Sequence, residues 1–161
     1  FSYAVINFMK LFISILIPLL VGGISGYFTS SGVEGWFATA NKPWFNPPNW
    51  IFAPVWTALY VMMGIALYLV WRTEAISSSV KQTAVILFVI QLTLNFFWSL
   101  IFFKLQQPGW AFAEIIVMWL AILFTILWFG KISSTAAWLL VPYICWVSFA
   151  SVLNYAIWKL N

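Results

Sequence analysis

The chain has 161 residues, of which 65% are hydrophobic and 6% are charged, and its mean hydropathy is +1.02. Polar side chains this scarce cannot cover a soluble globule of this size, so the composition predicts a membrane protein. The net charge of +4 comes from scattered lysines and arginines without a basic run, which excludes a nucleic-acid-binding surface built on clustered positive charge.

The first predicted transmembrane helix covers residues 9–29. The stretch from Leu11 to Val33 carries no charge, is long enough to cross a bilayer and exceeds the apolar core of a signal peptide. Pro18 predicts a kink within this helix. Glycines 22, 23 and 26 allow another helix to approach closely. They suit either packing inside the bundle or a dimer seam, and packing inside the bundle is the simpler interpretation.

Residues 30–48 form the predicted loop between the first two helices. Its central part, Trp36 to Pro48, is rich in tryptophan and proline and poor in the Gly and Ser of a passive linker. The prolines at 43, 47 and 48 lack a backbone N–H and fix φ, which excludes helix or inner strand there. Long loops between packed elements tend to be lids or binding loops. The alternative is an interfacial loop whose aromatic side chains rest among lipid headgroups.

The remaining predicted spans cover residues 49–71, 80–104, 110–129 and 134–158. Charged residues such as Arg72 and Lys104 bound them, and the breaker Gln106–Gly109 separates the third from the fourth. Pro142 predicts a kink in the last span. The sequence therefore predicts an all-α integral membrane protein, a single five-helix transmembrane domain over residues 1–161.

Polar and aromatic residues recur on one face of three predicted helices, at the i, i+4, i+7 spacing that places side chains together along a helix. These residues are Trp56, Tyr60 and Met63 in the second helix, Gln91, Asn95, Trp98, Ser99 and Phe102 in the third, and Tyr143, Trp146, Ala150, Leu153 and Asn154 in the fifth. At a rise of about 1.5 Å per residue, the three stripes reach similar depths, roughly 10 to 18 Å from the helix ends nearest the loop. Together they predict a ligand cavity with aromatic walls beneath a stiff lid.

A purely structural interpretation of these residues is also open. Gln91, Asn95 and Asn154 could instead hydrogen-bond one helix to another. Eight of the twelve tryptophans lie near span ends, where an interfacial aromatic belt explains them, namely Trp36, Trp44, Trp50, Trp71, Trp110, Trp128, Trp138 and Trp158. Trp119 is interpreted as packing or lipid contact. Glu114, about one turn inside the fourth helix, is interpreted as a solvated carboxylate near the helix N-terminus.

The residue types in the chain also limit its chemistry. Histidine and aspartate are absent, and Cys145 is the only cysteine. A Ser-His-Asp triad and an internal disulfide are therefore excluded, and three isolated glutamates predict neither a metal site nor a catalytic carboxylate pair. Any chemistry must use aromatic rings, amides or a bound ligand.

Four motifs carry a resemblance to a known family. They are Trp36 with Lys42-Pro43-x-x-x-Pro47-Pro48, Pro54-x-Trp56-x-x-x-Tyr60, Asn95-x-x-Trp98-Ser99, and Pro142-Tyr143-x-x-Trp146-x-x-Phe149-Ala150-x-x-Leu153-Asn154. In order and spacing these motifs resemble the translocator protein family, also called tryptophan-rich sensory proteins or peripheral benzodiazepine receptors. The resemblance covers about residues 9–160, essentially the whole chain.

This resemblance implies a five-helix bundle, frequently a homodimer, that binds porphyrins such as protoporphyrin IX and haem for tetrapyrrole transport, sensing or stress regulation. It implies no required cofactor, and animal members also bind cholesterol and benzodiazepine or isoquinoline ligands. By resemblance, Trp56 and Asn95 contact ligand carbonyl or carboxylate groups, and Phe37 and Pro47 form the lid side opposite the fifth helix. The full set of expected ligand-binding residues is Phe37, Pro47, Trp56, Tyr60, Asn95, Trp98, Tyr143, Trp146, Phe149, Ala150 and Asn154.

Two alternative functions are open. Some family members degrade protoporphyrin in light, and Trp56 and Trp146 match the tryptophans implicated there, so they are the candidate catalytic residues. The other alternative is a membrane scaffold without a ligand. The chain departs from the family by having Phe37 where several relatives have tyrosine, and it lacks the basic tail of animal homologues. These departures predict weaker cholesterol binding and a bacterial cell membrane as the location.

Overall fold

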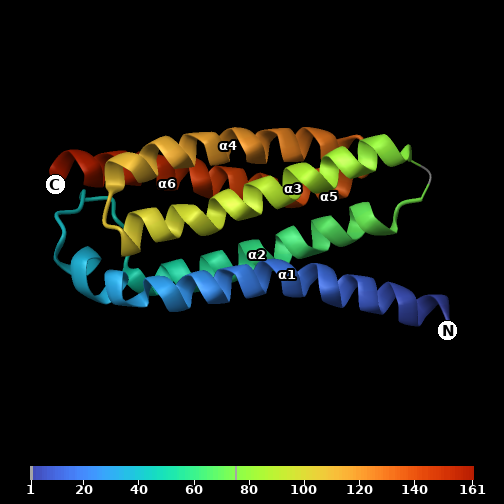
Figure 1. Ribbon diagram of the computed structural model, residues 1–161, viewed down its shortest axis with the longest axis horizontal. Coiled ribbons are helices and arrows are strands. Elements are labelled where there is room, and N and C mark those ends of the chain that lie inside the picture. Colours follow the sequence, from blue (N-terminus) through green and yellow to red (C-terminus); the bar gives the residue numbers. More distant parts are fainter. Residues whose placement is uncertain (1, 75) are drawn as a thin grey trace.

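The computed structural model describes residues 2–74 and 76–161. Within these residues the chain forms six α-helices and two π-helical turns (Figure 1), namely α1 (Tyr3–Gly32), η1 (Val33–Phe37), α2 (Asn49–Arg72), α3 (Ser78–Ser99), η2 (Leu100–Lys104), α4 (Pro108–Gly130), α5 (Ser134–Leu139) and α6 (Val141–Leu160). Joined end to end, they make five helical rods of 35, 24, 27, 23 and 27 residues, each long and apolar enough to cross a membrane. This confirms the predicted all-α bundle of five membrane helices.

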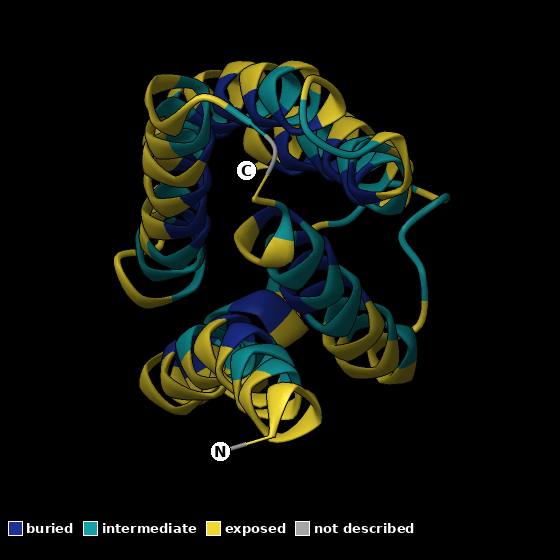
Figure 2. Ribbon diagram, turned by 90° about the vertical axis from the view of Figure 1, so that its right-hand side faces the viewer, coloured by how far each residue is buried: buried dark blue, intermediate teal, exposed yellow. Residues whose placement is uncertain are grey.

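The rods run up and down through the bundle, and the two chain termini lie at opposite ends (Figure 1). The most extensive packing joins α1 to α2, α3 to α4, and α4 to α6. Viewed from the end, buried residues face the centre and exposed residues cover the outer faces (Figure 2). One end, called here the loop end, carries the η1–α2 loop, the α3–α4 turn and the C-terminus (Figure 1).

The first rod is longer than the predicted span 9–29. It begins at Tyr3 and continues through η1 to Phe37, so Trp36 and Phe37 are helical and the loop is confined to residues 40–48. The predicted loop start at residue 30 is therefore wrong. In an apolar environment a helix satisfies every backbone polar group internally, and this outweighs the weak helix propensity of Ser and Gly until the first proline approaches.

Three glycines bring the first two rods and η2 into close contact. A Cβ on Gly64 of α2 would lie 2.4 Å from the Ile15 Cα of α1, and one on Gly32 would lie 1.9 Å from the Phe103 carbonyl oxygen. A Cβ on Gly22 would lie 2.3 Å from the Tyr60 ring. Gly22 therefore packs inside the bundle, as the simpler interpretation predicted.

The last rod is interrupted close to the predicted kink. Helix α5 ends at Leu139 and α6 begins at Val141, so the break falls just before Pro142. Proline has no N–H to donate to the preceding turn, and its ring clashes with the carbonyl of residue i−4. The kink predicted at Pro142 is thus observed as a change of helix.

Of two residues of α4 interpreted from the sequence, Trp119 packs against the core as expected and Glu114 differs from its interpretation. The indole Nε1 of Trp119 donates to Ser148 Oγ of α6 at 2.8 Å, so this tryptophan links two helices. Both carboxylate oxygens of Glu114 are buried and have no hydrogen-bond partner within the described residues, so the prediction of a solvated carboxylate is wrong. Glu114 follows Ala111 by three positions and precedes Met118 by four, and both are fully buried. Helical periodicity therefore places Glu114 beside the packed face.

Candidate functional site

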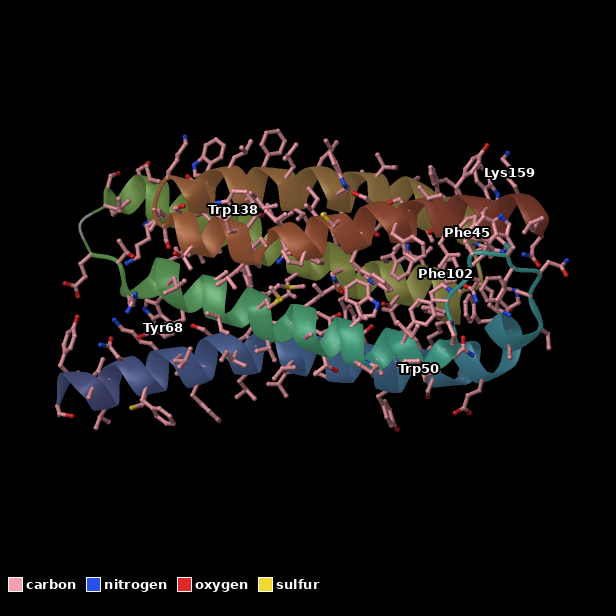
Figure 3. All side chains as sticks on the ribbon, turned by 180° about the vertical axis from the view of Figure 1, so that it is seen from behind. Phe45, Trp50, Tyr68, Phe102, Trp138 and Lys159 are labelled. Carbon is pink, nitrogen blue, oxygen red and sulfur yellow. The ribbon has the colours of Figure 1, made fainter. Side chains whose placement is uncertain are left out.

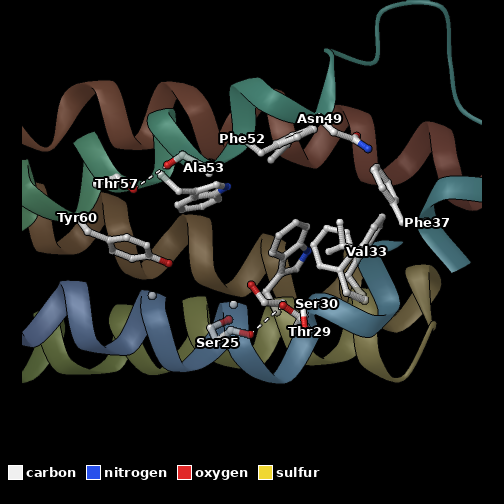
Figure 4. Close-up of a pocket in the computed structure, with 18 of the residues that line it drawn as sticks. Ser25, Thr29, Ser30, Val33, Phe37, Asn49, Phe52, Ala53, Thr57 and Tyr60 are labelled. Carbon is white, nitrogen blue, oxygen red and sulfur yellow. Dashed lines mark hydrogen bonds between the residues drawn. The ribbon is translucent and has the colours of Figure 1, made fainter. Parts of the chain in front are cut away.

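A cavity of about 510 Å³ lies inside the loop end of the bundle. Its walls come from α1, α2, α3 and α6, with η1 and η2 contributing at the loop end (Figure 4). The volume is typical of small-molecule sites. The three stripes read from the sequence each contribute to its lining, so they converge on one space as predicted.

Aromatic rings form a large part of the cavity wall. Those lining it are Phe37, Phe52, Trp56, Tyr60, Trp98, Phe102, Phe103 and Trp146. The rings support one another, because Trp98 stacks on Phe102 with centroids 5.3 Å apart and Phe52 meets Trp146 edge to face at 6.1 Å. Such packed rings make a rigid apolar surface. Aromatic side chains, including Phe45 and Phe102, crowd this end of the bundle (Figure 3).

The two π-helical turns close the loop end of the cavity. Turn η1 supplies Phe37 and turn η2 supplies Phe102 and Phe103, whose rings lie 5.3 to 5.9 Å from that of Phe37. Trp36 packs edge to face on Phe102 at 5.5 Å, so it also belongs to this cluster. Turns of this kind are rare and frequently occur at functional sites.

Small residues of α1 form another part of the wall, and the sequence interpretation missed them as site residues. They are Gly22, Gly23, Ser25, Gly26, Thr29 and Ser30. Their signal in the sequence is a run of Gly, Ser and Thr on one helix face, of which the sequence interpretation used only the three glycines, as a seam for packing in the bundle or for a dimer. The run leaves room for a ligand where larger side chains would fill the cavity.

A buried hydrogen-bond chain lies behind the cavity wall. Tyr60 Oη donates to Asn95 Oδ1 at 2.8 Å, Asn95 Nδ2 donates to Tyr143 Oη at 2.8 Å, and Tyr143 Oη donates to Gln91 Oε1 at 2.7 Å. Both polar atoms of the Asn95 amide are engaged, and neither Asn95 nor Tyr143 lines the cavity. In the structure Asn95 positions Tyr60, which is the member of the chain that faces the cavity.

Two further predicted residues, Trp98 and Asn154, line the cavity but use their polar atoms on the protein. Trp98 Nε1 donates to Asn154 Oδ1 at 3.0 Å, and Asn154 Nδ2 donates to the Pro108 carbonyl at 2.8 Å. In contrast, the buried Trp146 Nε1 has no partner within the described residues. The Trp146 ring lines the cavity, but its unpaired N–H is buried and is not in contact with the open space.

The loop of residues 40–48, the predicted lid, contributes no residue to the cavity wall. Neither Pro47 nor Phe149 lines the cavity. The Phe149 ring packs against the Trp146 ring, with centroids 5.4 Å apart. It also packs against the ring of the loop residue Phe45, with centroids 6.3 Å apart. The loop residue Lys42 contacts a residue that does line the cavity, since its Nζ lies 4.8 Å from the centroid of the Phe37 ring.

The loop is fastened to the end of α6 by a pair of asparagines. Asn41 N donates to Asn161 Oδ1 at 3.1 Å, Asn161 Nδ2 donates to the Asn41 carbonyl at 2.9 Å, and Asn41 Nδ2 donates to the Leu160 carbonyl at 3.2 Å. These three hydrogen bonds hold the lid against the bundle. The sequence interpretation did not single out either asparagine.

Charge is nearly absent from the cavity lining. Among the described residues that form it, Glu34 at the loop end is the one charged side chain, and it is exposed. The interior offers mainly aromatic faces and small side chains. Such a site suits a flat, largely apolar ligand with few hydrogen-bond acceptors.

Comparison with known proteins places this architecture in a family. The TspO/MBR family pattern matches residues 14–159. The chain belongs to the TspO/MBR family. It is 44% identical over 156 residues to the tryptophan-rich protein TspO of Archaeoglobus fulgidus, which covers 96% of this chain and 99% of that protein. It is 39% identical over 127 residues to the translocator protein of Homo sapiens, covering 78% of this chain and 75% of that protein.

A third TspO/MBR relative, the tryptophan-rich sensory protein of Cereibacter sphaeroides, is 35% identical over 128 residues, covering 80% of this chain and 78% of that protein. These matches confirm the family resemblance seen in the motifs. Membership of the TspO/MBR family, together with the five membrane-length helices, establishes an integral membrane protein and supports a ligand-binding or sensory role.

Proposed function

We propose that the protein binds porphyrins, such as protoporphyrin IX and haem, in the cavity at the loop end, and serves tetrapyrrole transport, sensing or stress regulation. The observation that carries the proposal is the aromatic cavity of about 510 Å³ with almost no charge in its lining. A flat conjugated macrocycle can stack on aromatic faces, and the transfer of its apolar surface out of water is favourable.

The polar groups suggest how such a ligand is oriented. Trp146 Nε1 is a buried donor without a partner, and we propose that the indole turns toward the cavity so that a ligand acceptor removes the cost of the unsatisfied group. The lining contains no lysine or arginine, so porphyrin carboxylates belong at the loop end, where the Lys42 ammonium lies over Phe37. The macrocycle would then extend inward along the aromatic wall.

A dark titration of the detergent-purified protein with protoporphyrin IX tests the proposal, with tryptophan fluorescence and the Soret band as readouts. We expect saturable quenching in the micromolar range and about tenfold weaker binding for Trp146→Phe, which removes one hydrogen bond. Trp138→Phe is the control, because Trp138 is 70% exposed and does not line the cavity. Linear quenching that is the same in both variants would mean that protoporphyrin IX only partitions into detergent. That result would favour a scaffold without a ligand.

A second candidate function is oxidation of bound protoporphyrin IX by light and oxygen. It is favoured by Trp56 and Trp146, which both line the cavity, and by stacking of Trp56 on Tyr60 with centroids 5.7 Å apart. An oxidised Trp56 would lie next to a phenol that heads a buried hydrogen-bond chain. Illumination should bleach the Soret band, and Trp56→Phe should stop the bleaching while retaining binding. Equal bleaching rates would exclude a radical role for Trp56.

Further partners and the location belong to the same proposal. Sterols and isoquinoline or benzodiazepine-type molecules are uncharged or weakly charged, so the apolar lining suits them as competing ligands. A bacterial cell membrane is proposed as the location; the relative from Chlorobaculum tepidum, 46% identical over 89% of the chain, supports it, although the relative from Archaeoglobus fulgidus is similar to the same degree. A homodimer is proposed from the family resemblance, and crosslinking in membranes would test it.

A further inference from the structure

We infer that the cavity opens sideways into the membrane between α1 and α2, and that its ligand passes through this opening from the lipid. The inference rests on the proposed function, because it concerns how the ligand of that cavity reaches it. Five small residues carry it, three on α1 and two on α2, and they are called here the rim. They are Gly23, Gly26, Ser30, Ala53 and Thr57.

The rim residues line the cavity and are also exposed. On α1 they lie between the face that packs on α2 and the outer face that carries Tyr27, which is 79% exposed. A Cβ on Gly23 or Gly26 would meet nothing within 4 Å. Figure 4 shows Ser30 on α1 facing the part of the cavity that Ala53 and Thr57 of α2 border on the other side. The cavity thus reaches the outer surface along the α1–α2 seam.

The opening has a defined deep end. Tyr60 lies against Gly22, where a Cβ would come within 2.3 Å of its ring, and Gly64 lies against Ile15 further from the loop. The two helices are therefore in close contact away from the loop end. Toward the loop end, the missing side chains of glycines 23 and 26 leave space between helices α1 and α2. This geometry confines the opening to the level of the cavity.

The chemistry of the rim suits a lipid-facing passage. Thr57 Oγ1 donates to the Ala53 carbonyl at 2.7 Å, and Ser30 Oγ donates to the Tyr27 carbonyl at 3.2 Å. Each hydroxyl is satisfied by its own helix, so the rim presents methyl and methylene groups without an unpaired donor. No rim residue is charged. A flat apolar molecule dissolved in the bilayer can cross such a rim without losing hydrogen bonds.

The α1–α2 seam and the lid are held in different ways. Among residues 2–37 and 49–72, all of which the structure describes, no side-chain hydrogen bond joins α1 to α2, so packing alone holds the seam. Three hydrogen bonds fasten the lid through Asn41 and Asn161. Separating the helices at the rim breaks no hydrogen bond, whereas lifting the lid breaks three. The side opening is therefore the easier route for a ligand in the membrane.

The test is the rate of protoporphyrin IX binding to the protein in lipid vesicles, measured by stopped-flow fluorescence. The variant Ser30→Leu with Thr57→Leu places two large side chains on the rim. The matched control is Ser31→Leu with Ala58→Leu, since both positions are exposed and neither lines the cavity. We expect the rim variant to slow association and dissociation by about tenfold or more, as an added barrier does, with the control unchanged. An association rate equal to the control would overturn the proposal.

A second arm tests the lid route in the same vesicles. Asn41→Ala removes one of the three hydrogen bonds that fasten the loop, the bond to the Leu160 carbonyl, and passage through the side opening predicts an unchanged association rate. A faster association in Asn41→Ala, with no slowing in the rim variant, would mean that the ligand passes under the lid. Absence of saturable binding in the unaltered protein would instead contradict the proposed function itself, so the two failures are distinguishable.

A third arm avoids dependence on the folding of the leucine variants. The exposed Cys145 is replaced by serine, and Thr57→Cys is introduced and labelled with pyrene maleimide after purification. The rim is then filled only after the protein has folded. We expect the labelled protein to bind porphyrin more slowly than its unlabelled form. Equal rates at complete labelling would overturn the proposal.

Discussion

Asn95 joins three helices through one side chain. It accepts from Tyr60 of α2, donates to Tyr143 of α6 and belongs to α3. Its side chain is 2% exposed, so water does not compete for these bonds. At the residue scale, this amide holds the Tyr60 side chain in its place in the cavity wall.

Asn95→Ala should lower the free energy of unfolding by about 1 to 2 kcal/mol, because it removes two interhelical bonds and leaves the buried Tyr60 phenol without a partner. Thermal unfolding in detergent measures the change. Thr93→Ala is the control, since the exposed Thr93 hydroxyl donates only to Val89 of its own helix. Equal melting temperatures for the two variants would show that the network adds no stability.

Gln106 is the one non-glycine residue with positive φ among the described residues, at 56°. It follows the end of η2, where Gln107 N donates back to the Ile101 carbonyl at 3.0 Å. Gln106→Gly should stabilise the protein by about 0.5 to 1 kcal/mol, because relief of left-handed strain exceeds the entropy gained by the unfolded chain. Gln107→Gly, at φ −119°, should destabilise it. A melting temperature that falls for both would refute the strain argument.

At the scale of elements, the contact between α1 and η2 depends on the absence of a side chain at one position. Gly32 lies against the backbone carbonyl of Phe103, which cannot rotate away as a side chain could. This contact places η1 beside η2 and so closes the loop end of the cavity.

Gly32→Ala should destabilise the protein by about 1 to 3 kcal/mol, since the backbone must shift to admit a methyl group. The control is Gly35→Ala, where a Cβ meets nothing within 4 Å; it should be neutral or slightly stabilising because alanine favours helix. Thermal unfolding of the two variants side by side decides the matter. If the Gly32→Ala protein were as stable as the Gly35→Ala protein, the close contact at Gly32 would not determine the stability of the fold.

At the scale of the whole molecule, the cavity is lined by four of the five rods. A ligand inside it contacts all four and binds only the folded bundle. Saturating protoporphyrin IX, at about one hundred times its dissociation constant, should therefore stabilise the fold by about 2.7 kcal/mol. The melting temperature in the dark measures this, and at the same porphyrin concentration Trp146→Phe should show a smaller rise. An unchanged melting temperature at saturation would contradict binding within the bundle.

The sequence by itself determined the five spans, the family and the helix faces that meet at the cavity. These features follow from local rules, since apolar length marks a membrane helix and a period of 3.6 residues sets which side chains share a face. Trp56, Trp98 and Trp146 were found in this way. The sequence did not predict that the first rod ends at Phe37 instead of residue 29. The reason is that the membrane environment, rather than local propensity, decides where that helix stops.

Only the tertiary structure decided how neighbouring helices use those faces. It engaged Asn95 with two tyrosines, buried the Glu114 carboxylate, and turned the small face of α1 into a cavity wall that opens toward lipid. The physical reason is that a helical period gives directions around one axis. The distance and rotation between two axes depend on packing along both helices, down to the missing side chain of a single glycine.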